Sequence, residues 1–319
     1  WANSATGDYY VCTDATTDGN VWTNVDNAQD SIQPWVYQGT QYGYTSGGWV
    51  PPNSDVVDKY AYASDGDAAD VGNLSVARHA GASSHSGTHG YTSGGDHADR
   101  GNIIDKFPFA SDTNASDVGD LSTTHLGGAG QSSETYGYCC GSSDPAKANI
   151  DKFSLSSDGS GSDIGNLTVA RGNIGESSSL THGYAHCGTG SPKSNVLEKF
   201  TFASDNDATD VGNAVRGSDS LTAGASSSTH GYIIGGEGST YEIGKYSHSS
   251  DGDSTDIGDL SDGQHIAPAG SSSTSHGYRA GGGNPMSNVV DKFPFASDTN
   301  ASDVGNLTVA RNYVCGQSF

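Results

Sequence analysis

The chain has 319 residues, of which 14 are Lys or Arg and 37 are Asp or Glu, so its formal net charge is −23. This acidic balance argues against nucleic acid and against anionic membrane surfaces as partners, because both are bound through clustered Lys and Arg. No apolar run approaches the roughly 20 residues of a membrane-spanning helix, so we expect no membrane insertion. Leu, Ile, Val and Phe together number 48, or 15% of the chain, and a fraction that low with so much charge is on its own typical of disorder. The patterning of those residues must therefore decide whether the chain folds.

The chain begins at Trp1 and contains one methionine, Met286, so we expect a processed or incomplete chain. Its five cysteines fit no common zinc-binding spacing. Ahead of the repeats, residues 8–14 and 21–25 are predicted to be short strands, because they resemble two of the repeated strands described below.

A Gly-Tyr motif, usually preceded by His, then recurs six times, and a pair of small residues follows two positions after each copy. Consecutive copies are 46 to 48 residues apart. Periods of this length, with several short strands in each unit, are typical of the blades of a β-propeller. The motif glycines are Gly43, Gly90, Gly137, Gly183, Gly231 and Gly277.

Two further motifs complete each unit. The first is a Lys followed by large residues at alternate positions, as in Lys106-Phe107-Pro108-Phe109, which predicts a strand with both rings on one face. The second is Asp-Val-Gly-Asn, as in residues 70–73, which predicts the outermost strand. Polar clusters such as residues 111–116 are typical of the hairpin turns between them. No segment has the apolar period of a helix, so the predicted fold class is all-β.

These repeats resemble the kelch family of β-propellers. Arg78 and Arg171 each precede a Gly of the small pair by 17 residues, as the family's Arg does, and His125 and His265 occupy the same position in other units. The family's Trp on the outermost strand is missing, and residues such as Leu74 take its place. The resemblance covers residues 32 to 311 and implies a divergent kelch-like propeller.

Six full sets of four strands are expected between Ser31 and Leu307, and residues 313–319 fall where a seventh innermost strand would begin. We therefore favour seven blades of about 47 residues over six, closed by strands from both termini. The chain would be a single domain, 1–319, in which residues 1–30 and 312–319 form the closing blade.

In that closing blade Cys12 and Cys315 would lie on neighbouring strands, roughly 5 Å apart, which is within reach of a disulfide. Two free buried thiols are the alternative, and the choice leaves the redox compartment open.

Pairs of Asp five residues apart recur in every unit, and some units add a third Asp between them. Oxygen-rich loops can hold Ca²⁺, so weak candidates for calcium ligands are Asp65, Asp67, Asp70, Asp251, Asp253 and Asp256. We favour the alternative that each Asp caps its own turn through backbone N–H groups, because a catalytic site is normally unique whereas scaffolding repeats. For the same reason the repeated Lys, such as Lys59 and Lys106, are expected to pair with a nearby Asp at the surface.

Other groups give no recognisable active site. A ring of metal-binding histidines would be broken where Tyr42 and Tyr136 replace His, so His89 and its equivalents are expected to line turns. The local group of Cys139, Cys140, His186 and Cys187 lacks metal-ligand spacing. Galactose oxidase, a propeller enzyme, uses Tyr, Cys and copper, and Tyr184 and Cys187 supply the residue types without the motif. With short loops in every unit, no catalytic residue and no cofactor beyond structural calcium is predicted.

The units are nearly identical in places: residues 107–119 recur unchanged at 293–305. Repeats with this sequence resemble those of virion and tail-associated proteins of bacteriophages, especially phages of cyanobacteria. The resemblance implies a non-enzymatic phage tail or fibre component, located in the virion or outside the cell. Its partner would be a glycan or protein of the host surface, or another virion subunit within a larger symmetric assembly. The alternatives are a secreted propeller enzyme, of the oxidase or glycosidase type, and a glycan-binding lectin.

Overall fold

The computed structural model of the chain describes residues 10–15, 21–24, 35–97, 101–190, 193–215, 221–237, 241–262 and 266–319. Within these ranges every regular element is a strand, and no helix occurs that could cross a lipid bilayer. The chain divides into two compact units, residues 1–36 and 37–319. In the first unit, β1 (Tyr10–Asp14) and β2 (Val21–Asn24) form an antiparallel hairpin.

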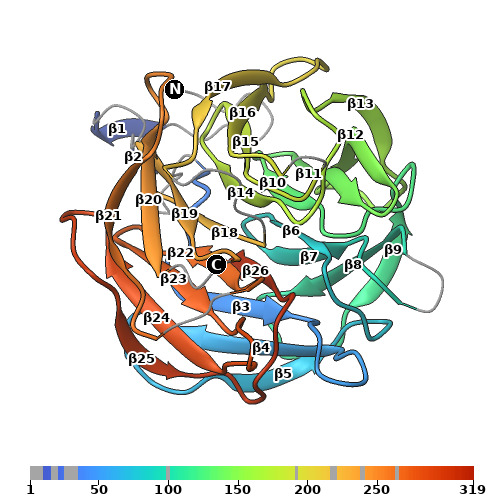
Figure 1. The fold of residues 1–319 in the computed structure, drawn as a ribbon. Helices are drawn as coiled ribbons and strands as arrows, with labels where there is room; N and C mark the ends of the chain where they lie inside the picture. Colours follow the sequence, from blue (N-terminus) through green and yellow to red (C-terminus); the bar gives the residue numbers. More distant parts are fainter. Residues whose placement is uncertain are drawn as a thin grey trace. The chain divides into compact units, whose positions relative to one another are not determined.

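The second unit is a β-propeller of six blades, each a four-stranded antiparallel sheet (Figure 1). From the innermost strand outward, the blades are as follows. Blade 1 is β26 (Cys315–Ser318), β3 (Tyr42–Ser46), β4 (Val56–Ala61) and β5 (Ala69–Asn73). Blade 2 is β6 (Ala82–His85), β7 (His89–Ser93), β8 (Ile103–Pro108) and β9 (Ser116–Asp120), and blade 3 is β10 (Ala129–Ser132), β11 (Tyr136–Ser143), β12 (Ala146–Ser154) and β13 (Ser162–Asn166). Blade 4 is β14 (Gly175–Ser178), β15 (His182–His186), β16 (Val196–Thr201) and β17 (Thr209–Asn213). Blade 5 is β18 (Ala223–Ser226), β19 (His230–Ile234), β20 (Glu242–Ser247) and β21 (Thr255–Asp259), and blade 6 is β22 (Ala269–Ser272), β23 (His276–Ala280), β24 (Val289–Pro294) and β25 (Ser302–Asn306).

The prediction of seven blades is wrong, and the reason is the partner of the last strand. β26 pairs with β3, with Cys315 opposite Ser46, so it fills the innermost position of blade 1 instead of starting another blade (Figure 1). The inner strand expected just after Ser31 is replaced by residues 37–39, of which only Gly39 makes an isolated bridge, to Ser273. The ring is thus closed by the C-terminal strand joining the first three strands of the repeat region. A single domain spanning 1–319 stays a prediction.

A circle of backbone hydrogen bonds marks the closure. Two residues before each innermost strand, one residue adopts a left-handed conformation, with φ between 51° and 65°. Its N–H donates to the carbonyl of the equivalent residue in the preceding blade, at 2.6–3.0 Å, and the bond from Ala80 to Tyr313 completes the circle. The six residues are Ala80, Gly127, Asn173, Leu221, Ala267 and Tyr313. We call them the mouth circle, because they surround one end of the central channel.

An aromatic contact joins each blade to the next. The motif Tyr on the second strand packs against the alternating large residues on the third strand of the next blade. The centroid of the Tyr44 ring, for example, lies 5.7 Å from that of Phe107 and 4.8 Å from that of Phe109. The last contact, between Tyr278 and Tyr62 at 4.7 Å, closes the ring. The predicted alternation is therefore confirmed: both rings of the third strand lie on one face.

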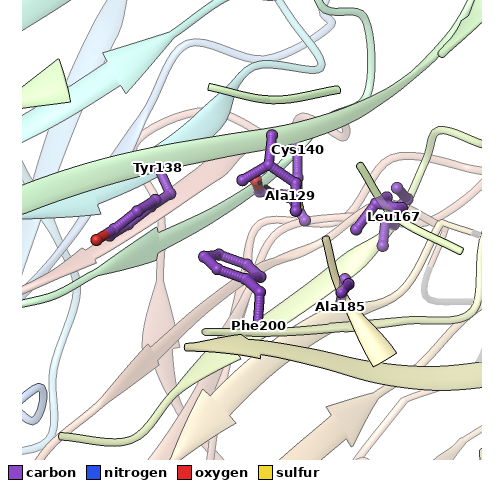
Figure 2. Close-up of a cluster of buried hydrophobic side chains, with 9 residues drawn as sticks. Ala129, Tyr138, Cys140, Leu167, Ala185 and Phe200 are labelled. Atoms are coloured by element: carbon purple, nitrogen blue, oxygen red, sulfur yellow. Dashed lines mark hydrogen bonds between the residues drawn. The ribbon is translucent and has the colours of Figure 1, made fainter. Parts of the chain in front are cut away.

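The Gly of the Gly-Tyr motif makes room for this contact. Gly90 lies opposite Phe107 in the blade 2 sheet, and a Cβ on Gly90 would overlap the Phe107 ring. The same overlap arises at the other five motif glycines. Each third-strand ring thus covers a Gly of its own blade and touches a Tyr of the preceding blade. Figure 2 shows one interface of this kind, in which Phe200 of blade 4 lies beside Tyr138 and Cys140 of blade 3.

The innermost strands pack so closely that four of them need Gly at their second position. A Cβ on Gly130 would overlap Ser83, and one on Gly270 would overlap the backbone carbonyl of Gly224. Each innermost strand contacts both neighbours around the axis. The small residues at this position thus allow the innermost strands to approach one another at the axis.

Replacing Gly270 with Ala should therefore destabilise the ring strongly. Overpacking a core typically costs about 1–3 kcal/mol, and here the obstacle is backbone, which cannot move aside as a side chain can. The measurement is the free energy of unfolding in denaturant. Gly87→Ala is the matched control, because a Cβ at Gly87 meets nothing within 4 Å. Equal stability of the two variants would contradict the close packing of the innermost strands.

Candidate functional site

The last Asp of each repeated pair lies in the outermost strand of its blade, not in the turn before it. Its Oδ1 accepts a hydrogen bond from the backbone N–H two residues later, at 3.0–3.2 Å in all six blades. These Asp residues thus bond a nearby backbone N–H, as predicted, but within the outermost strand instead of the turn. The six residues are Asp70, Asp117, Asp163, Asp210, Asp256 and Asp303.

The first Asp of each pair forms a salt bridge with the repeated Lys of the preceding blade. Lys59 and Asp112 are 2.5 Å apart, and Lys106 and Asp158 are 2.7 Å apart. The last pair, Lys292 and Asp65 at 2.8 Å, joins blade 6 to blade 1. The predicted surface pairing is confirmed, and it connects blades instead of staying within one. The remaining pairs are Lys152 with Asp205, Lys199 with Asp251, and Lys245 with Asp298.

The third polar residue of each turn also reaches the preceding blade. Asp67 accepts a hydrogen bond from the N–H of Asn306 at 3.0 Å, and Asp253 accepts one from Asn213 at 2.9 Å. All six proposed calcium ligands, Asp65, Asp67, Asp70, Asp251, Asp253 and Asp256, therefore have partners within the protein. Among the residues that the structure describes, no three His, Cys, Asp or Glu gather as a metal site would require.

Buried ion pairs stabilise most of the connections between successive blades. The acidic residue before the repeated Lys is fully buried and pairs with a buried cation, as Asp105 does with Arg78 at 2.9 Å. The same carboxylate accepts the backbone N–H of the residue two positions after the end of the preceding blade's outer strand, here Ser75 at 2.9 Å. The other pairs are Asp58 with Arg311, Asp151 with His125, Glu198 with Arg171, and Asp291 with Arg279.

Blades 3, 5 and 6 depart from this arrangement. In blade 6 the cation is Arg279 of β23, and His265, which the sequence placed at the Arg position, lies outside the described residues. In blade 3 His125 stands in for Arg; burial by itself lowers its pKa, but Cys139, Asp151 and the Gly141 carbonyl together raise it to about 10. These partners favour the protonated ring of His125, which can then take the place of the Arg in other blades. In blade 5 Gly244 replaces the acid, and Ser254 accepts the N–H of Val215 instead, at 2.7 Å.

The other predicted groups do not form one site. The motif histidines share hydrogen bonds of 2.8–2.9 Å with the hydroxyl residue before them in the turn, so their turn-lining role is confirmed. Cys139, Cys140 and Cys187 lie in three different hydrophobic clusters. Tyr184 is buried, with its ring stacked on His248 at 4.9 Å.

The predicted disulfide has its two cysteines in different units of the chain, with Cys12 in β1 and Cys315 in β26. Cys315 is buried in blade 1, and burial raises the pKa of its thiol to about 12. The pairing stays a prediction.

A cleft of about 780 Å³ breaks the six-fold pattern on the face that carries the mouth circle. Trp49, Pro285 and Met286 come from loops between second and third strands, and Asn312 and Tyr313 from the connection into β26. Trp49 is 37% exposed and is held by backbone hydrogen bonds with Asn312. This cleft was not predicted from the sequence; the signal for it was the single Trp and single Met among the repeated loops.

The central channel holds a second departure. A cavity of about 50 Å³ lies just inside the mouth circle, and Glu176 of β14 lines it. Burial raises the pKa of Glu176 to about 8, although the Ser83 hydroxyl, 3.5 Å away, lowers it slightly. Glu176 was also not predicted as a site residue, although it is the one acid at a position otherwise held by Ser or Gly.

The opposite end of the channel is crossed by residues 37–39. The Tyr37 carbonyl bonds the His85 ring at 2.7 Å, the Gln38 amide donates to Ser226, and the Gly39 N–H donates to Ser272. Three consecutive residues thus contact the innermost strands of blades 2, 5 and 6, so the cavity opens toward the mouth circle.

No protein-family model matches the chain, and no curated protein matches it significantly.

Removing a buried cation should cost far more than removing a surface one. Arg171→Ala leaves Glu198 buried without a charge partner, which typically costs about 3–5 kcal/mol. Lys199→Ala breaks the exposed pair with Asp251 and should cost at most about 1 kcal/mol. Chemical denaturation measures both. Arg171→His, which copies His125 of blade 3, should retain much of the stability and guards against a variant that fails to fold; equal losses for the two alanine variants would contradict the assignment.

Proposed function

We propose that this propeller is of the kelch-like kind and acts as a non-enzymatic attachment module. It binds a glycan of a host surface in the cleft beside Trp49. The observation that carries the proposal is the contrast between the repeated polar groups and the cleft. The repeated polar groups form hydrogen bonds and ion pairs between blades, whereas the set of residues that lines the cleft is found at one place in the ring.

The lining suits a sugar ring. Sugars present C–H faces that pack on aromatic rings, and hydroxyls that pair with amides and carboxylates. Here the exposed ring of Trp49 stands near Asn284, Asn312 and Glu237, which supply such polar groups. The indole also makes an edge contact with His79 at 5.2 Å, which limits its movement. A preorganised aromatic surface needs little ordering when a ligand binds.

The biological setting rests on the resemblance of the repeats to those of phage virion and tail-associated proteins. We propose that the module is a tail or fibre component, in the virion or outside the cell, and part of a larger symmetric assembly. A second virion subunit is an alternative partner. The rigid, nearly identical units suit display of a binding face, because rigidity limits the entropy lost on attachment.

Trp49→Ala should weaken glycan binding by at least about tenfold, which corresponds to about 1.4 kcal/mol. Binding of the full chain is measured on a glycan array and then by titration with the best glycan. The matched control is Tyr136→His on the opposite face, because His stands at that position in four other blades.

Two results would contradict the proposal. One is a Trp49→Ala variant that binds as tightly as the unchanged chain. The other is turnover of the glycan, which would favour the alternative of a secreted propeller enzyme.

A further inference from the structure

We propose that the central channel binds one hard metal cation at Glu176. The proposal concerns the axis of the ring and is independent of the cleft beside Trp49. It begins from the second position of the innermost strands, which is Gly in four blades because the neighbouring backbones leave no room for a side chain. Only Ser83 in blade 2 and Glu176 in blade 4 carry side chains there.

These two side chains meet across the axis. Blades 2 and 4 are not neighbours, yet Oγ of Ser83 donates to Oε1 of Glu176 at 3.5 Å. The carboxylate therefore lies within the channel, inside the mouth circle, and not in the packing between two adjacent blades. The cavity around it has a volume of about 50 Å³. A water molecule occupies about 30 Å³ in the liquid, so there is room for an ion with a water ligand.

The carboxylate has no cation beside it. Among the described residues that line the cavity, none is Lys, Arg or His, and Glu176 is the one charged side chain. The buried carboxylates of the blades differ, because Asp58, Asp105, Asp151, Glu198 and Asp291 each have a cation within the protein. Burial disfavours the charged form of this partly buried carboxyl and raises its pKa, and a bound cation would stabilise the charged form.

The donor atoms indicate the class of cation. Besides the carboxylate, the cavity offers the hydroxyls of Ser83 and Thr222, and the backbone carbonyls of the mouth circle keep a second lone pair. Oxygen donors of this kind select hard cations such as Ca²⁺. A single carboxylate gives a low ligand charge, which is typical of the weaker calcium sites, with Kd of about 10⁻⁴ to 10⁻³ M.

The test uses the full chain, freed of metal with a chelator and kept in a buffer whose only cation is an organic ammonium ion. Ca²⁺ is titrated calorimetrically, and the unfolding temperature is followed with Ca²⁺, Mg²⁺, Na⁺ and K⁺ in separate arms. We expect at least one of these cations to bind once per chain and to raise the unfolding temperature. Glu176→Gln should weaken that binding by about tenfold or more.

Two further variants keep the test decisive. Glu176→Gly restores the residue found in four other blades, so it should fold even if Glu176→Gln does not, and it should bind no ion. Glu134→Gln removes an exposed acid from a turn of blade 3 and should bind as the unchanged chain does.

Either of two outcomes overturns the inference. The first is the absence of any response to the four cations. The second is binding that survives in Glu176→Gln and Glu176→Gly, and a stoichiometry above one would then point to the Asp turns. Neither outcome affects glycan binding at Trp49, so the two proposals fail separately.

Discussion

The contact of each motif Tyr with the third-strand ring of the next blade is the interaction on which the structure depends. One ring, such as Phe107, covers Gly90 in its own sheet and packs on Tyr44 of the blade before it. The same side chain therefore stabilises a blade and fixes its angle to the neighbour. Because this contact is repeated around a closed ring, a chain with only 33% hydrophobic residues can bury a core.

Polar groups also join neighbouring blades. The Lys–Asp pairs and the turn residues that accept backbone N–H groups link the outer parts of neighbouring blades, and the buried cation–carboxylate pairs link their interiors. Repetition of a charged residue here is a sign of scaffolding. The places where repetition fails, at the Trp49 cleft and at Glu176, are the places to which we assign ligands. Changes elsewhere, as at His125, are compensated by local partners and keep the scaffold intact.

Much of the fold was predictable because its signals are local. The alternation around Phe107, the Asp70 hydrogen bond and the Lys59 pair each depend on a few residues or on a motif repeated at a constant period. The blade count was not, because β26 finds its partner β3 at the other end of the ring, and residues 313–319 are equally compatible with a seventh blade. The cleft and the isolation of Glu176 were also missed. The cleft is formed by loops of several blades, and the cavity around Glu176 by the innermost strands and the residues just before them, and these parts meet only after closure.

The most direct test of the account is amide hydrogen exchange at the mouth circle, followed by NMR. If six blades close around one axis, the amides of Ala80, Gly127, Asn173, Leu221, Ala267 and Tyr313 should all exchange slowly and at similar rates. The Ala80 amide is decisive, because its bond to the Tyr313 carbonyl joins the two ends of the repeat region. Fast exchange of Ala80 beside slow exchange of the other five would mean an open or larger ring and would contradict the account.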